Sequence, residues 1–173
     1  MDGWLLAPGF VTTLARMHLL ASRPALGRPA PWELPTATAL IVVAFAVVGP
    51  EPRALPLVYL AAVTPHLCSV DLAVRRLPNR VVLPGFAAAG FGLVGQWMIT
   101  GEWLLTALVA GLAYFVFLLV PALAGGMGMG DVKLAGVLGL SAGLVGQPTA
   151  LLSPVTAFLL GGVVALVALR GGK

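Results

Sequence analysis

Two long runs without a charged residue constrain this chain more than any other feature. They are Val81–Thr100 and Trp103–Ala124, and only Gly101 and Glu102 separate them. About 20 apolar residues can cross the hydrocarbon core of a bilayer as a helix, which satisfies its own backbone hydrogen bonds. Charged residues make up 9% of the chain, against about 25% in soluble domains. Lipid is therefore the main solvent, and the sequence predicts a membrane protein built from helices.

Seven apolar segments are candidate membrane spans. The first is the weakest because Arg16 and His18 lie near its end, and the second and sixth are short for a full crossing. The amino terminus lacks the basic start and the cleavage site of a secretory signal, so we expect it to be retained as an anchor. We predict an all-α, polytopic membrane helix bundle of six to seven transmembrane helices. The candidate spans are Trp4–Leu20, Leu34–Val48, Ala54–Val70, Val81–Thr100, Trp103–Ala124, Val132–Val145 and Ala150–Leu169.

The basic residues predict how the bundle lies in the membrane. If every segment crosses, the linkers alternate between two sides, and most linker arginines and lysines fall on one of them. Because positive residues collect on the cytoplasmic side, we predict a protein of the cytoplasmic (inner or plasma) membrane with this side in the cytoplasm. The basic residues suit the headgroups of the lipid bilayer, and we expect no nucleic-acid partner. The basic side carries Arg23, Arg28, Arg75, Arg76, Arg80, Arg170 and Lys173, and the other side carries Arg53, Glu51 and Glu102.

Two of the six acidic residues stand out by their position. Asp71 ends an apolar segment, and Asp131 begins another directly after Gly-Met-Gly. An ionisable group at such a boundary suggests a functional site, although either aspartate can equally cap a helix end. The other four lie in termini or linkers, where a solvated charge is ordinary. They are Asp2, Glu33, Glu51 and Glu102.

The chain topology allows Asp71 and Asp131 to meet. Two uncharged spans lie between them, one leaving the cytoplasmic face and one returning to it, although 60 positions separate the two residues. Adjacent carboxylates cannot both ionise easily, so they share one proton and can activate a water and protonate a leaving amine. The two aspartates therefore form a candidate hydrolytic site.

Four glycines precede Asp131 in the stretch GGMGMGD. A backbone without side chains can adopt positive φ and can let another chain, such as an extended peptide, come close to the aspartate. The glycines can equally serve only to break a helix and to let helices pack tightly. They are Gly125, Gly126, Gly128 and Gly130.

Asp71 with the following RRLPN, and the later GMGMGDVKL, closely resemble the type IV prepilin peptidases, membrane aspartyl proteases with a GxGD motif. The resemblance runs from about residue 54 to the end. We therefore divide the chain into amino-terminal helices with a short cytoplasmic loop (1–53) and a protease core (54–173). The resemblance implies that Asp71 and Asp131 are the catalytic pair. It also implies residues that bind the substrate or shape the site, namely Arg75, Arg76, Asn79, Gly128, Gly130 and Lys133.

The individual roles of the residues around the pair stay open at this point. Arg75 and Arg76 anchor the topology or bind the substrate. Asn79 reads as a turn residue that shapes the loop beside Asp71, and Lys133 contacts either lipid headgroups or the substrate. His66, inside an apolar segment, either tunes the site or only packs between helices.

The resemblance further implies a substrate and a reaction. The substrate is a type IV prepilin or pseudopilin, whose short basic leader is cut off after a glycine, next to a hydrophobic helix at the cytoplasmic membrane face. One aspartate acts as general base on water, and the other, protonated, polarises the scissile carbonyl. Many relatives carry a cytoplasmic insert with zinc-binding cysteine pairs, associated with methylation of the product. This chain has one cysteine, Cys68, and only the loop Ala21–Glu33 at that place, so we expect no metal, no cofactor and no methylation.

Two functions from other classes remain as alternatives. In a small proton-coupled membrane transporter, Asp71 and Asp131 would be relay groups and the glycines would mark a broken helix. Such a carrier is expected to hold its carboxylates near the bilayer midplane, whereas both aspartates fall at segment ends on one side. A non-catalytic component of a pilus or secretion system would keep the scaffold but would not need both aspartates.

Overall fold

Every long regular element is an α-helix in the residues that the structure, a computed structural model, describes: 31–74, 77–101 and 105–171. A single 3-10 turn, Pro52–Ala54, precedes the second of these helices. The all-α class is confirmed. The first candidate span, Trp4–Leu20, lies outside the described residues, as do Arg75 and Arg76. The helices are α2 (Glu33–Val48), α3 (Leu55–Val74), α4 (Asn79–Thr100), α5 (Leu105–Leu123), α6 (Met129–Val145) and α7 (Gln147–Gly171).

Four of the described helical segments are long and apolar enough to span a bilayer. The helices α2 and α6 are shorter, with 16 and 17 residues, and 17 residues at 1.5 Å each cover about 26 Å of a hydrocarbon core of about 30 Å. The prediction that these two segments are short is therefore confirmed. The chain is an integral membrane helix bundle. The four spanning segments are Pro52–Ala73, Asn79–Thr100, Leu105–Leu123 and Gln147–Arg170.

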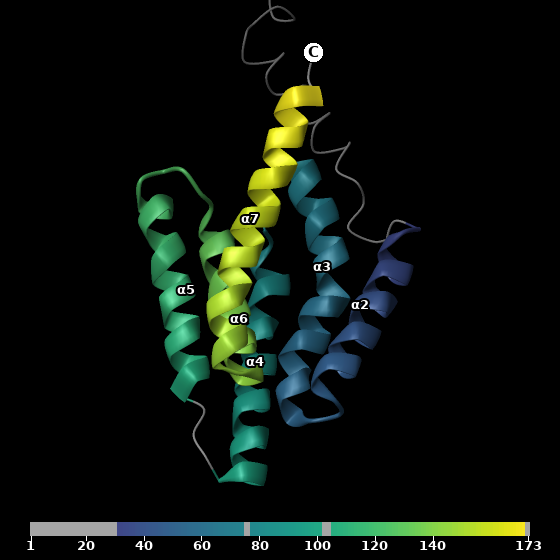
Figure 1. Cartoon of the computed structure of the whole chain (residues 1–173), viewed down its shortest axis with the longest axis vertical. Coiled ribbons are helices and arrows are strands. Elements are labelled where there is room, and N and C mark those ends of the chain that lie inside the picture. The colour runs from purple at the N-terminus through teal and green to yellow at the C-terminus, as the bar shows by residue number, and fades with distance from the viewer. Residues whose placement is uncertain (1–30, 75–76, 102–104, 172–173) are drawn as a thin grey trace, which may run out of the picture.

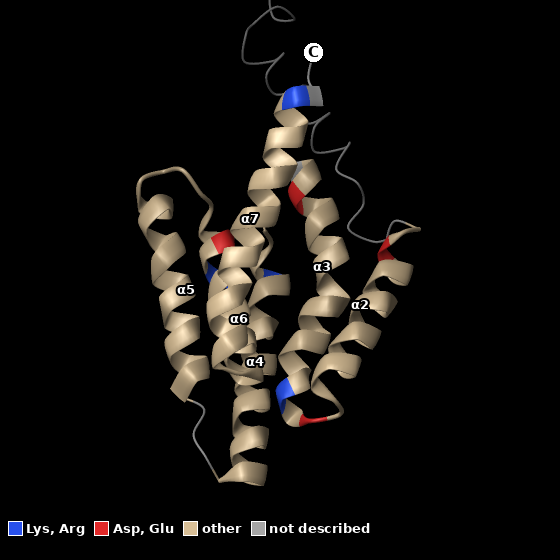
Figure 2. Ribbon diagram, viewed as in Figure 1, with Lys and Arg blue, Asp and Glu red and all other residues tan. Residues whose placement is uncertain are grey.

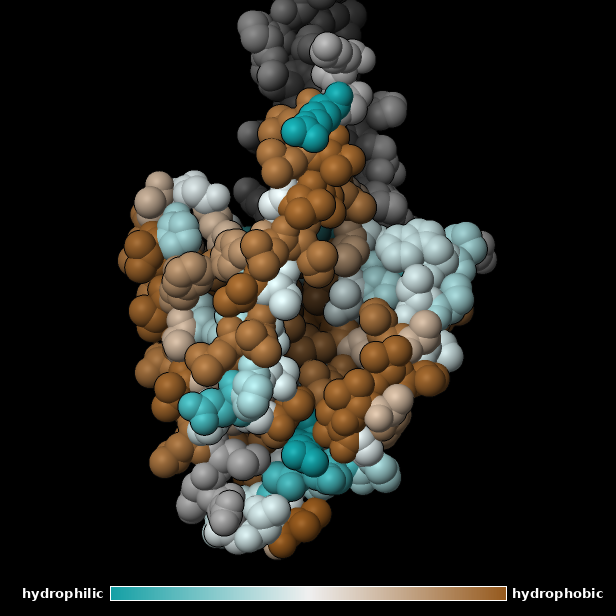
Figure 3. Space-filling view, viewed as in Figure 1, coloured by the Kyte–Doolittle hydropathy of each residue, from teal (hydrophilic) through white to brown (hydrophobic). Residues whose placement is uncertain are grey.

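The bundle is apolar outside and packs through small residues inside. Large apolar side chains cover the outer faces of α5 and α7, where lipid replaces water (Figure 3). Between α5 and α6 a Cβ on Gly139 would lie 2.4 Å from the Ala110 carbonyl oxygen, and one on Gly143 would lie 2.4 Å from the Ala107 Cα. Only small residues permit so close an approach of two membrane helices. This packing fixes α6, the helix that begins at the GxGD motif.

Successive helices run in opposite directions, so their ends gather at two ends of the bundle (Figure 1). We call one of them the aspartate end: α3, α5 and α7 finish there, and α2, α4 and α6 begin there. Figure 2 shows the few charges near helix ends, with long uncharged stretches between them. This arrangement agrees with the alternating linkers that the sequence predicts. The aspartate end carries Asp71, Arg80, Asp131, Lys133 and Arg170, and the opposite end carries Glu51 and Arg53, an ion pair of 2.7 Å.

Candidate active site

Asp71 lies in the last turn of α3 with an exposed side chain. The helix does not stop at this residue, as the apolar pattern suggested, but continues to Val74. Within the described residues the Asp71 carboxylate makes no hydrogen bond or ion pair, while the neighbouring Arg75 and Arg76 lie outside them. The Asp71 carboxylate is thus an exposed group on the last turn of a regular helix at the aspartate end.

Asp131 is half-buried in the first turn of α6, whose N-cap is Gly128. Its Oδ2 accepts a hydrogen bond from the Gly128 backbone N–H at 3.2 Å, and its own N–H donates to the Gly128 carbonyl oxygen at 3.1 Å. The carboxylate thus caps its own helix, in the place where the helix dipole favours a negative charge. A carboxylate has about four lone-pair sites, so one such hydrogen bond leaves Asp131 able to act on a water as well.

The two motif segments touch each other through Gly130 and Leu77. Leu77 lies in the connection between α3 and α4, six residues after Asp71. A Cβ on Gly130 would lie 2.8 Å from the Leu77 Cβ and 3.1 Å from its carbonyl oxygen. The absence of a side chain at Gly130 is therefore what allows the start of α6 to press against the segment that follows Asp71.

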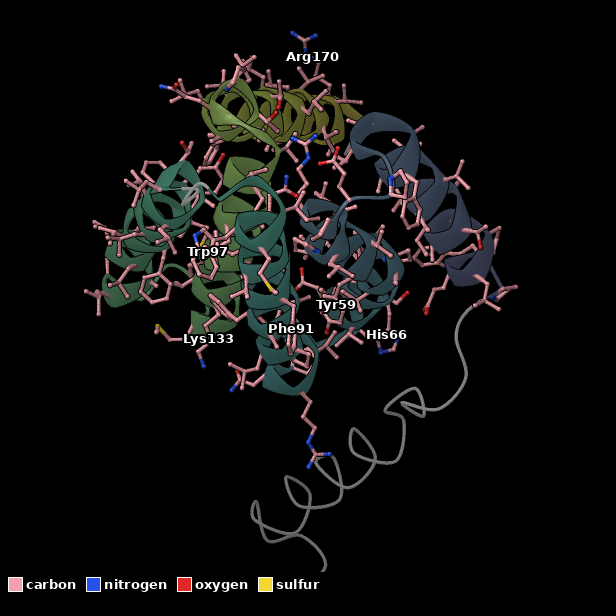
Figure 4. All side chains as sticks on the ribbon, turned by 90° about the horizontal axis from the view of Figure 1, so that it is seen from below. Tyr59, His66, Phe91, Trp97, Lys133 and Arg170 are labelled. Atoms are coloured by element: carbon pink, nitrogen blue, oxygen red, sulfur yellow. The ribbon has the colours of Figure 1, made fainter. Side chains whose placement is uncertain are left out.

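A hydrogen bond joins the same two segments a turn further along α6. Lys133 Nζ donates to the Asn79 Oδ1 at 3.1 Å, and Asn79 is the first residue of α4. Lys133 is labelled in Figure 4, at the edge of the bundle beside α4 and α6. Both residues were predicted to bind the substrate or to shape the site, and in this structure they bind each other. Residues 54 positions apart in sequence thus hold the two motifs together.

The remaining glycines of the motif serve different purposes. Gly125 adopts a φ of +80°, the left-handed conformation that lets the chain turn after α5. A Cβ on Gly128 would lie 3.2 Å from the Asp131 Oδ2, so this position leaves space for the capping carboxylate. The space at Gly128 and Gly130 is therefore taken up by this chain's own atoms in this structure, as in the alternative in which the glycines serve tight packing.

Glu33 was expected to be a solvated linker residue, and this expectation is wrong. It is the first residue of α2 and only 7% exposed. Its Oε1 accepts a hydrogen bond from the Ser69 hydroxyl at 2.7 Å, and its Oε2 lies 3.3 Å from the His66 Nδ1. Its carboxylate reaches α3, against which α2 packs. An acidic residue immediately before an apolar run is also the pattern of a first helical turn, and this signal could have identified it.

The contacts of His66 and Ser69 do not have the arrangement of a nucleophilic catalytic triad. In a nucleophilic triad the imidazole lies between the hydroxyl and the carboxylate. Here the Glu33 carboxylate lies between the Ser69 hydroxyl and the His66 ring. The Ser69 hydroxyl also contacts the Pro65 carbonyl oxygen of its own helix at 3.2 Å. The group is therefore a contact between α2 and α3, and Asp71 and Asp131 remain the candidates for catalysis.

Among the described residues, no three His, Cys, Asp or Glu side chains lie close enough together to hold a metal ion. Cys68, on α3, is an exposed free thiol.

Comparison with known families matches residues 57–167 to the type IV leader peptidase family. The matched region includes Asp71, the RRLPN segment and the GxGD motif, and covers more than half of the chain. No curated protein and no solved structure matches the chain.

Proposed function

Because the chain belongs to the type IV leader peptidase family, we propose that it removes the leader peptide from type IV prepilins or pseudopilins as a membrane-embedded aspartyl endopeptidase. Asp71 and Asp131 form the catalytic dyad, and the reaction takes place at the cytoplasmic face of the membrane. The observation that carries this proposal is the contact between the two motif segments, made by Gly130 with Leu77 and by Lys133 with Asn79. This contact supports the proposal because Leu77 and Asn79 follow Asp71 by six and eight residues, while Gly130 and Lys133 flank Asp131.

The reaction needs one proton shared between the two carboxylates. The ionised carboxylate takes a proton from a water, whose oxygen attacks the scissile carbonyl carbon. The protonated carboxyl donates a hydrogen bond to the carbonyl oxygen, where negative charge develops. When the C–N bond breaks, the leaving amine takes a proton from the dyad, which is then ready for the next substrate. Water is the one reactant besides the peptide in these proposed steps.

The residues around the dyad have shaping roles in this proposal. Lys133 and Asn79 bind each other across α6 and α4, and Gly130 makes room for Leu77. Arg75 and Arg76 follow Asp71 by four and five residues in the chain, and we assign them the role of topology anchors at anionic headgroups. We expect the product amine to remain unmethylated.

An apolar cavity beside α6 supports a substrate with a hydrophobic segment. It measures about 740 Å³ and lies between α3, α5, α6 and α7. Its α6 wall includes Ala135, Leu138 and Ala142, which follow Asp131 at intervals of 4, 7 and 11 residues and so share its helix face. In Figure 3 the surface is hollowed next to α7, within a brown, apolar region. A hydrophobic helix that continues from the scissile bond can rest against this face below the dyad.

The proposal is tested by co-expressing a candidate prepilin with wild type, Asp71→Asn and Asp131→Asn, and following the loss of the leader by mass. Asparagine keeps the size of each side chain but cannot exchange a proton, so we expect both variants to reside in the membrane and to cut nothing. Glu51→Gln is the matched control, because Glu51 lies at the opposite end of the bundle, and it should cut normally.

Cleavage by either aspartate variant would disprove the two-aspartate mechanism. If wild type cuts no candidate prepilin, the proton-coupled transporter becomes the better explanation. Proton uptake into vesicles that contain the wild-type protein would then be the measurement to make.

A further inference from the structure

The contact between α2 and α3 lies close to Asp71 along the chain and has no part in the chemistry proposed above. It consists of Glu33 at the start of α2 and of Ser69 and His66 on α3, with distances of 2.7 Å and 3.3 Å to the carboxylate oxygens. Burying a carboxylate is costly unless hydrogen bonds compensate it. The buried Glu33 carboxylate, which accepts a hydrogen bond from a residue two positions before Asp71, therefore calls for an explanation.

A proline makes this part of α3 dependent on outside contacts. Pro65 lies inside α3 and removes one backbone hydrogen bond, so the helix can bend at this point. His66, Ser69 and Asp71 all lie on the segment after it. Glu33 contacts the side chains of His66 and Ser69 in this segment, and the helix α2 packs against α3. The segment of α3 after Pro65 is thus tied to α2 through Glu33.

The helix geometry places Asp71 opposite this contact. At 3.6 residues per turn, Asp71 is rotated by about 200° from Ser69 and by about 140° from His66. The helix α3 lies between α2 and α4 (Figures 1 and 4), and His66 is labelled on its outer side in Figure 4. When Glu33 holds His66 and Ser69 toward α2, the Asp71 side chain is turned away from α2, to the side on which α4 and α6 begin.

We propose that Glu33 is a positioning residue that sets the rotation and direction of the α3 segment after Pro65, so that Asp71 faces the start of α6. This inference rests on the proposed dyad. Glu33 touches neither the substrate nor the reacting atoms, and it acts through Ser69 and His66. Its loss misaligns Asp71 and lowers kcat, while the binding of the substrate along the apolar helices is retained.

The kinetic test compares Glu33→Ala with Glu33→Gln. Alanine removes both contacts, and because a displacement of about 1 Å can cost about 10²-fold in rate, we expect a loss of kcat of that order with KM unchanged. Glutamine can accept the Ser69 hydrogen bond and still interact with His66, so it should restore much of kcat. Glu51→Ala is the matched control, since it removes an exposed glutamate at the opposite end, and it should leave kcat unchanged.

A second measurement separates positioning from general damage to the fold. Spin labels are attached at Asp71→Cys and Asp131→Cys in a Cys68→Ser background, because Cys68 is an exposed free thiol. With Glu33 present we expect one narrow distribution of label distances, and with Glu33→Ala a broader or longer one. If Glu33→Ala does not accumulate in the membrane, Ser69→Ala removes the shorter contact and should show the same changes to a smaller degree.

The two measurements can each overturn the inference. A wild-type kcat in Glu33→Ala, or an unchanged distance distribution, would show that Glu33 does not position Asp71. If wild type cuts no prepilin, the proposed function fails instead, and the label distances still decide whether Glu33 sets the direction of α3.

Discussion

Gly130 sets how closely the two motif segments approach each other. A Cβ at this position would lie 2.8 Å from the Leu77 Cβ and 3.1 Å from the Leu77 carbonyl oxygen. Neither atom is the end of a flexible side chain, so the backbone of one segment would have to move. The requirement for glycine in GxGD comes here from a contact within the chain, and φ at this residue is not in the left-handed region.

Gly130→Ala should therefore impair both stability and cleavage. Overpacking a close contact typically costs about 1–3 kcal/mol, and displacement of the start of α6 moves Asp131 with it. We expect a lower midpoint of thermal unfolding in detergent and a large loss of kcat. Gly162→Ala is the matched control, because a Cβ on that α7 glycine would meet no atom within 4 Å. Equal behaviour of the two variants would contradict the assigned contact.

The helices themselves could be predicted from the sequence, and so could the last residues of α2, α4 and α6, but other helix boundaries could not. The structure begins α6 at Met129 and α7 at Gln147, each three residues before the expected apolar segment, and continues α3 four residues past Val70. Apolar runs mark the part of a helix that lies in lipid, whereas backbone hydrogen bonds continue through polar residues at the membrane boundary. Asp71 and Asp131 lie in these extensions beyond the expected apolar segments, so both belong to helices and not to the loops between them.

At the scale of elements, the hydrogen bond between Lys133 and Asn79 should couple α6 to α4. Removing either partner breaks the same bond, so Lys133→Met and Asn79→Ala should each slow cleavage, and the double variant should be little worse than either one. The side chains are at least partly exposed, so we expect a coupling energy of about 0.5–1 kcal/mol. It is measured as a double-mutant cycle on kcat/KM.

Arg170→Met supplies the control for that cycle. Arg170 is a cation in the last turn of α7, at the same end of the bundle but far from Lys133 (Figure 4). Its effect should add to that of Asn79→Ala without coupling. Additive effects of Lys133→Met and Asn79→Ala would show that their hydrogen bond does not join the two helices during catalysis.

For the molecule as a whole, the sequence predicts that the segments of Asp71 and Asp131 form one site. Two spans lie between them, and an even number of spans returns the chain to the same end of the bundle. It cannot predict which side chains make the contact. The pairing of Lys133 with Asn79, and of Glu33 with Ser69 and His66, depends on how the helices are rotated about their axes. Uniformly apolar helices carry little information about that rotation, because lipid-facing and interior residues are equally hydrophobic. The position of Glu33 in a first helical turn could have been predicted, but its burial against α3 could not.

The apolar cavity provides a test of substrate binding that does not touch the dyad. Leu138 lines this cavity from α6, and Leu138→Trp would fill part of its volume of about 740 Å³. If the hydrophobic helix of the substrate rests there, KM for a full-length prepilin should rise severalfold while kcat stays the same, since Asp71 and Asp131 lie at the end of the bundle. A substrate shortened to the leader and the first residues after the scissile bond should not distinguish the variant from wild type.

Leu159→Trp is the matched control, because it adds the same bulk to a lipid-exposed position of α7 outside the cavity. This variant should leave KM unchanged. If KM is also unaltered in Leu138→Trp, then lipid, and not the substrate, fills the cavity.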